Sequence, residues 1–178
     1  GTIWFAWYTG DAIGMLIVTT FILTWSAGDR PRFTTRNVAE AIVLGAVLLA
    51  STIPLFQTPF SYVYAIFPVT IWTAIRFGPR GAATSSFILA ALAVWFTVQG
   101  VGPFAGSTAV NNLFELQTFI TVFTLTSLIL AALMGVLIPM TMLKLGRDPA
   151  VGSSVLITAV TDSGGFFIFL GLATLFLL

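Results

Sequence analysis

All the basic residues of the chain lie in three short polar breaks, which alternate with breaks that contain none. The second break (57–58), the fourth (101–112) and both ends of the chain hold no lysine or arginine. Between the breaks the sequence is almost continuously apolar. This pattern predicts a protein that crosses a membrane several times with its basic loops in the cytoplasm. The basic residues are Arg30, Arg32 and Arg36 in the first break, Arg76 and Arg80 in the third, and Lys144 and Arg147 in the fifth.

The composition supports a membrane protein and sets the number of spans. Only 7% of the residues are charged and 58% are hydrophobic, whereas about 25% of a soluble domain is charged. A hydrocarbon core about 30 Å thick needs about 20 apolar residues per helix. We therefore expect an all-α fold, a polytopic membrane helical bundle of six transmembrane helices with the N-terminus and the C-terminus outside. The six stretches are Ile3–Trp25, Ala39–Phe56, Pro59–Phe77, Ala82–Gln99, Leu113–Leu143 and Pro149–Leu178.

The residue types that are missing exclude several kinds of chemistry. The chain has no cysteine and no histidine, so it has no disulfides, thiol nucleophiles or imidazole ligands. It shows no nucleophile–base pair, phosphate loop or metal triad, and we expect that it is not an enzyme. A net charge of +1 does not favour nucleic acid as a partner. The arginines are better explained as topology determinants near the anionic headgroups of the lipid bilayer.

Glycine and proline predict where the helices turn or bend. The run Gly78-Pro79-Arg80-Gly81 predicts a tight turn between the third and fourth spans. Pro68 and Pro139 lie inside spans and predict kinks. The fifth span would be about 46 Å long, so strong tilt, or a break near Gly135 and Pro139, must absorb the excess. The excess length is also compatible with a seam between two sequences of different origin.

Several motifs in the first three quarters of the chain occur in a fixed order. They are Trp7 with Gly10–Gly14, then Trp72–Ala82, then Ala93-Val94-Trp95 with Gln99–Phe104, and finally Leu116–Phe119. With these motifs, residues 1–133 resemble the first class of MASE-type integral membrane sensory domains of bacterial signalling proteins. The resemblance covers the later part of that domain. It implies a sensory module in the bacterial inner membrane, with a soluble signalling domain on another chain or on a missing part of this one.

The last quarter carries a second set of motifs, Gly135–Pro139, Gly146–Ala150, Ser153, Ser154, Ile157–Asp162 and Gly165–Gly171. Residues 134–178 resemble the last two spans of MgtE-type magnesium transporters. The resemblance implies a homodimer or larger assembly, in which the helix with the Thr-Asp pair lines an ion pathway. The side chains of Ser154, Thr158 and Asp162 recur every four residues on one helix face, and their oxygens suit Mg²⁺. Alternatively, a protonated Asp162 forms a hydrogen bond with a neighbouring helix.

Polar side chains near the outer level of the spans form a second candidate site. Asp11, Gln99, Glu115 and Gln117 would lie at a similar depth, and we expect an outward-opening pocket for a signal or a proton, walled by Trp7 and Trp95. Alternatively, Glu115 caps its helix and Asp11 pairs with a donor on another helix.

Arg76 and Arg80 flank the Gly-Pro turn. We expect them to anchor the cytoplasmic face of the protein. The alternative is that they relay motion to a soluble output domain.

Three functions remain open from the sequence. The first is a membrane sensory module without a catalytic domain of its own. The second is part of a magnesium or other divalent-cation pathway in which Asp162 is the pore-lining carboxylate. The third is a composite or truncated membrane fragment without independent activity.

Overall fold

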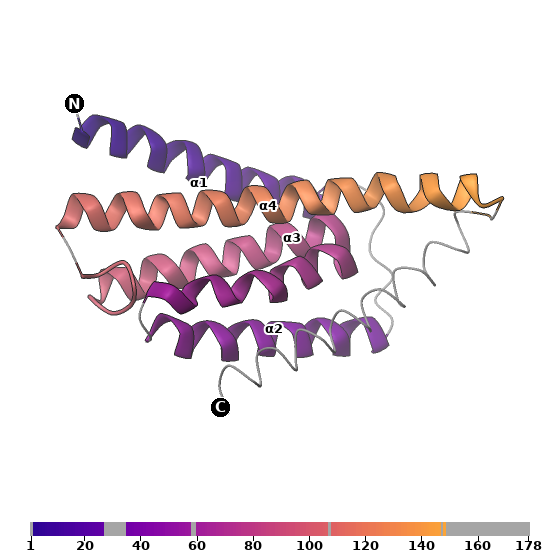
Figure 1. Cartoon of the computed structure of the whole chain (residues 1–178), viewed down its shortest axis with the longest axis horizontal. Helices are drawn as coiled ribbons and strands as arrows, with labels where there is room; N and C mark the ends of the chain where they lie inside the picture. The colour runs from indigo at the N-terminus through magenta and orange to yellow at the C-terminus, as the bar shows by residue number, and fades with distance from the viewer. Residues whose placement is uncertain (1, 27–34, 58–59, 107, 147, 149–178) are drawn as a thin grey trace.

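A computed structural model describes residues 2–26, 35–57, 60–106, 108–146 and 148. These residues form an all-helical bundle (Figure 1). By length and composition, four of the helices could cross a membrane. The elements are α1 (Thr2–Ser26), α2 (Thr35–Phe56), the short 3₁₀-helix η1 (Phe60–Ile66), α3 (Phe67–Val98) and α4 (Ala109–Lys144).

The long helix α3 consists of two segments that fold back on each other at Gly78. That residue has φ 60° and ψ −146°, which lies outside the helical region. This conformation favours glycine. Pro79 follows at the start of the second segment, where its fixed φ suits the first turn of a helix. Figure 1 shows the two segments side by side, and the Thr73 hydroxyl bonds to the Ser85 hydroxyl across the hairpin at 3.0 Å. The predicted turn at 78–81 is therefore confirmed.

The hairpin accounts for the predicted third and fourth spans. The predicted first, second and fifth spans correspond to α1, α2 and α4. The predicted sixth span, 149–178, lies outside the described residues. The total of six spans and the placement of both termini outside the membrane therefore stay predictions.

The two prolines predicted to kink their spans behave differently. Pro68 lies in the first turn of α3, where the chain passes from the 3₁₀-helix η1 into α-helix. It therefore begins an α-helical segment and does not interrupt one. Pro139 lies inside α4, which is a single helix of 36 residues. The alternative of a break near Gly135 and Pro139 is wrong. Neighbouring groups in a helical bundle can satisfy the carbonyl that a proline leaves free, and the helix continues for about 54 Å in all.

Aromatic side chains fill the end of the bundle away from the Gly78 turn. Phe104, from the loop between α3 and α4, is fully buried. Its ring centroid lies 5.2 Å from that of Phe119 and 6.1 Å from that of Phe56. Gly100 and Gly102 have φ angles of 72° and 108°, which turn the loop back onto the helices. The Gly-x-Gly-Pro-Phe motif thus places an aromatic side chain in the core.

Small residues line the contact between α3 and α4 nearer the turn. Ala74 and Ala82, one from each segment of α3, and Ala131 of α4 form a buried cluster. Small side chains at such contacts let membrane helices approach closely. The hairpin is therefore packed against the middle of α4, while α2 packs against the hairpin and η1.

Candidate functional site

The helix ends flanked by basic residues point toward one end of the bundle, where α4 extends beyond the others (Figure 1). Figure 1 shows the C-terminal end of α1, the N-terminal end of α2, the Gly78 turn and the C-terminal end of α4 at that same end. Arg76 and Arg80 lie on either side of the turn, and Lys144 is the last residue of α4. We name this region the basic end. Three polar contacts hold the helices together there.

The first contact joins α3 to α2. Arg76, in the first segment of α3, forms an ion pair with Glu40 of α2. The guanidinium donates from Nε to the Glu40 Oε2 atom at 2.9 Å and also from Nη2 to the same oxygen. Both side chains are mostly buried, with 20% and 28% of their surface exposed. Hydrogen bonds between charged groups are stronger than neutral ones, so this pair ties α2 to the hairpin.

The second and third contacts join α3 to α1. Arg80 Nε donates to the backbone oxygen of Thr24 at 3.0 Å. That oxygen belongs to the last turn of α1, where carbonyls have no partner within the helix and the helix dipole is negative. The Trp25 indole nitrogen donates to the Thr84 hydroxyl at 3.1 Å. Arg76 and Arg80 therefore have partners on two different helices, in addition to any role in anchoring the protein at the membrane surface.

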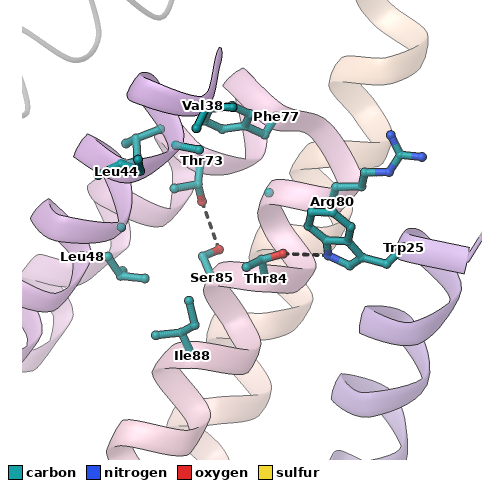
Figure 2. A pocket seen from close by; sticks show the side chains of 14 residues that line it. Trp25, Val38, Leu44, Leu48, Thr73, Phe77, Arg80, Thr84, Ser85 and Ile88 are labelled. Atoms are coloured by element: carbon teal, nitrogen blue, oxygen red, sulfur yellow. Dashed lines mark hydrogen bonds between the residues drawn. The ribbon is translucent and has the colours of Figure 1, made fainter. Parts of the chain in front are cut away.

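A cavity of about 470 Å³ is lined by residues of α1, α2 and α3, including Trp25, Arg80 and Thr84 from the contacts between α1 and α3. Figure 2 shows side chains of α2 on one wall, side chains of α3 on the other, and Trp25, Thr84 and Arg80 at one edge. The Thr73 and Ser85 hydroxyls in the wall bond to each other, so the wall presents little unsatisfied polar surface. The lining residues are Trp25, Val38, Ala41, Ile42, Leu44, Gly45, Leu48, Thr73, Phe77, Arg80, Gly81, Thr84, Ser85 and Ile88.

A separate polar contact joins α1 to α4 near the opposite end. The amide of Gln117 donates from Nε2 to the Ala6 backbone oxygen at 2.9 Å. Its Oε1 atom accepts from the Thr9 hydroxyl at 2.7 Å. A Cβ atom on Gly10 would lie 3.0 Å from Gln117 Nε2, so the glycine gives the amide room to reach α1. These hydrogen bonds fix the position of α1 along α4.

The other residues of the predicted outer pocket do not join this contact. Asp11, Gln99 and Glu115 all have exposed side chains. A second cavity, of about 390 Å³, is lined in part by Gln117 but by none of these three. Trp7 and Trp95, which we predicted as the walls of the outer pocket, are also exposed. Binding of a signal or proton by these four polar residues stays a prediction. The alternative that Glu115 caps its helix is wrong, because α4 begins at Ala109 after the N-cap residue Thr108.

Replacing Gln117 by leucine is expected to loosen α1 from α4. The variant leaves the Thr9 hydroxyl without its interhelical acceptor, and a double-mutant cycle with Thr9→Ala should give a coupling of about 1 kcal/mol. The measurement is unfolding of the purified protein in detergent. Thr118→Leu, at an exposed neighbouring position on the same helix, is the matched control and should leave stability nearly unchanged. Additive effects of Gln117→Leu and Thr9→Ala would contradict the role of this contact.

The proposed metal ligands Asp162, Thr158 and Ser154 lie outside the described residues. Within the described ranges no group of three or more acidic side chains gathers to hold a metal ion. Binding of Mg²⁺ therefore stays an untested prediction.

Sequence reasoning missed the partners of the two arginines. Glu40 is the only acidic residue in its span, and that fact alone could have suggested an ion pair. No feature of the sequence indicates that the backbone oxygen of Thr24 accepts a hydrogen bond from Arg80.

The comparison with protein families covers most of the helical part of this arrangement. The model of the MASE1 family matches residues 1–137. The chain belongs to the MASE1 family. MASE1 is a membrane sensory domain, and the four apolar helices fit a membrane protein. No curated protein and no solved structure matches the chain.

The MASE1 match supports one of the two sequence resemblances. It runs to Leu137, a few residues beyond the boundary predicted at Leu133, and α4 crosses that boundary as one helix. The MgtE-type resemblance of residues 134–178, and the magnesium transport that it implies, are not supported.

Proposed function

We propose that this MASE1 chain is a sensory module of the bacterial inner membrane, with its basic end in the cytoplasm, and that it acts on a separate signalling domain. Its ligand enters the 470 Å³ cavity at the basic end. The observation that supports this proposal is the position of the cavity, which is bordered by all three helices that the polar contacts join. A ligand there would change how α1 and α2 are held on the hairpin.

The lining favours an apolar ligand. Ligand pockets usually have volumes of 300–1,000 Å³ and mostly apolar walls with a few polar groups, and this cavity fits both criteria. Leu44, Leu48 and Ile88 supply apolar surface deep in the cavity, whereas Arg80 and Thr84 lie toward one edge (Figure 2). A molecule with an acyl chain and one small polar end would match this distribution.

Helix α4 is the element that would pass a movement on. It packs against both α3 and α1, so a shift of either changes its surroundings. It also extends beyond the ends of the other helices at the basic end (Figure 1). The positively charged loops of membrane proteins usually face the cytoplasm, which would place the end of α4 on the side where soluble signalling domains lie.

Replacing Gly45 by leucine is expected to place a side chain in the cavity, to block the ligand there and to abolish the response. A Cβ atom at this position meets nothing within 4 Å, and Gly45 lines the cavity, so we expect the side chain to extend into the cavity without disturbing the fold. Leucine also favours helix over glycine by about 1 kcal/mol. The variant should therefore fold at least as well as the parent protein. Spin labels on Val43→Cys in α2 and Val136→Cys in α4 report the distance between the helices, because the chain has no other cysteine.

Decanol is the probe for this experiment. We expect decanol to change the distance distribution in the parent protein and to leave it unchanged in Gly45→Leu. The matched control is Gly135→Leu, another helical glycine with open space around it but outside the cavity, which should respond like the parent. A response to decanol that persists in Gly45→Leu would contradict the cavity as the ligand site.

A further inference from the structure

The outward face of α1 carries a carboxylate at a depth where lipid tails would surround it. Asp11 is exposed and lies about 22 Å from the end of α1 at Ser26, at 1.5 Å per residue, which is inside a hydrocarbon core about 30 Å thick. Trp4, Tyr8 and Met15, at the spacing of one helix face, are 72%, 62% and 69% exposed. The opposite face of α1 is buried at Ala6 and Ile17, against α3 and α4. The exposed stripe is therefore the side that the bundle leaves open.

Lipid cannot satisfy this carboxylate. A charged side chain at the centre of a spanning helix costs about 2.5–3.5 kcal/mol on insertion scales, the cost falls toward the helix ends, and charged residues within spans almost always pair with protein groups. Among the described residues, Asp11 contacts no hydrogen-bond donor. The amide of Gln117, on the neighbouring helix α4, already forms hydrogen bonds with Thr9 and Ala6.

The charge distribution indicates what the missing partner must bring. The basic residues whose side chains the structure describes, Arg76, Arg80 and Lys144, all lie at the basic end. Within the part of the chain that the structure describes, the end that contains Asp11 has no lysine or arginine. The exposed rings of Trp4 and Tyr8 stack with their centroids 5.7 Å apart, and aromatic faces attract cations.

We infer that the outward face of α1 docks a further transmembrane helix that carries a lysine or arginine at the depth of Asp11. The cation pairs with the Asp11 carboxylate beside the Trp4–Tyr8 stack, and apolar residues of the partner cover Met15. The inference rests on the membrane assignment and not on the proposed ligand cavity, so either can fail without the other. A second copy that docks through the same face does not fit, because it brings another Asp11 and α1 carries no lysine or arginine.

The test uses the full chain in phosphatidylcholine vesicles, with a fluorescent donor on Val98→Cys. The acceptor is on a leucine-rich transmembrane peptide that has one lysine a third of the way along, or leucine at the same place. We expect the lysine peptide to associate at least about fivefold more tightly than the leucine peptide. Asp11→Leu should remove this preference, and Glu115→Leu, which removes another exposed carboxylate, should keep it.

Thermal unfolding of Asp11→Leu checks that the variant is folded, and the exposed site predicts parent-like stability. Tyr8→Ala is a second variant, which should weaken the preference without removing the carboxylate. Equal association of the two peptides with the parent chain would overturn the inference. So would a lysine preference that survives in Asp11→Leu. Efficient disulfide cross-linking of Met15→Cys between two copies would assign the face to self-association and overturn it as well.

Discussion

Replacing Gly81 by alanine is expected to open the α3 hairpin and to destabilise the protein by about 3 kcal/mol. A Cβ atom at this position would overlap the backbone oxygen of Thr73 and would lie 2.6 Å from the Cβ atom of Phe77. Neither group is the flexible end of a side chain, so the two segments must separate. The expected loss is at the upper end of the range for overpacked sites, and the better helix propensity of alanine offsets about 1 kcal/mol of the steric effect. Unfolding with sodium dodecyl sulfate measures the change.

Gly135→Ala is the matched control for this prediction. Gly135 also lies within a helix, but a Cβ atom there meets nothing within 4 Å. The control should be neutral or slightly stabilising, because alanine is a better helix former. Equal stability of Gly81→Ala and the parent protein would mean that the two segments of α3 do not approach each other as closely as the structure shows.

Removing either member of the Arg76–Glu40 pair is expected to release α2 from the hairpin. Each single alanine variant removes one member of a mostly buried ion pair, and we expect a loss of about 2 kcal/mol per variant. The double variant should lose less than the sum, with a coupling of about 1.5 kcal/mol after allowance for partial exposure. Thermal unfolding of the four proteins in detergent gives the cycle. A distance between labels on α2 and α4 should broaden in the single variants.

Lys144→Ala is the control for the ion pair. Lys144 is a basic residue at the same end of the bundle with an exposed side chain, so its removal changes the net charge by the same amount as Arg76→Ala. Stability should change by no more than about 0.5 kcal/mol. A loss as large as that of Arg76→Ala would attribute the effect to net charge and not to the contact with Glu40.

Much of the fold could be predicted because its signals are local. Apolar length determined the helices, and Gly78-Pro79 determined the reversal, since only glycine accepts the backbone conformation found there. The effect of Pro139 could not be predicted in the same way. A proline inside a helix breaks it in water, but whether it does so in a bundle depends on which neighbours satisfy the freed carbonyl, and a single sequence does not give those neighbours.

The candidate site was less accessible from the sequence because its contacts cross between helices. Arg76 and Arg80 were recognised as basic residues beside the turn, but their partners are a carboxylate 36 residues earlier and a backbone oxygen 56 residues earlier. The sequence predicts Gln117 at a depth similar to that of Asp11, but the packing of α4 turns its amide toward Ala6 and Thr9, while Asp11 is exposed. The depth of a residue along its span follows from counting residues, whereas the direction in which its side chain points follows from how the helices pack.

The reversal at Gly78 also bears on how the protein enters its membrane during synthesis. One glycine joins the two segments of α3, so there is no connecting loop that could be handled separately from them. The two segments would leave the ribosome as a nearly closed pair and would partition into lipid together. The arginines on either side of the glycine would then stay behind on the side of synthesis and fix the direction of insertion for both segments at once.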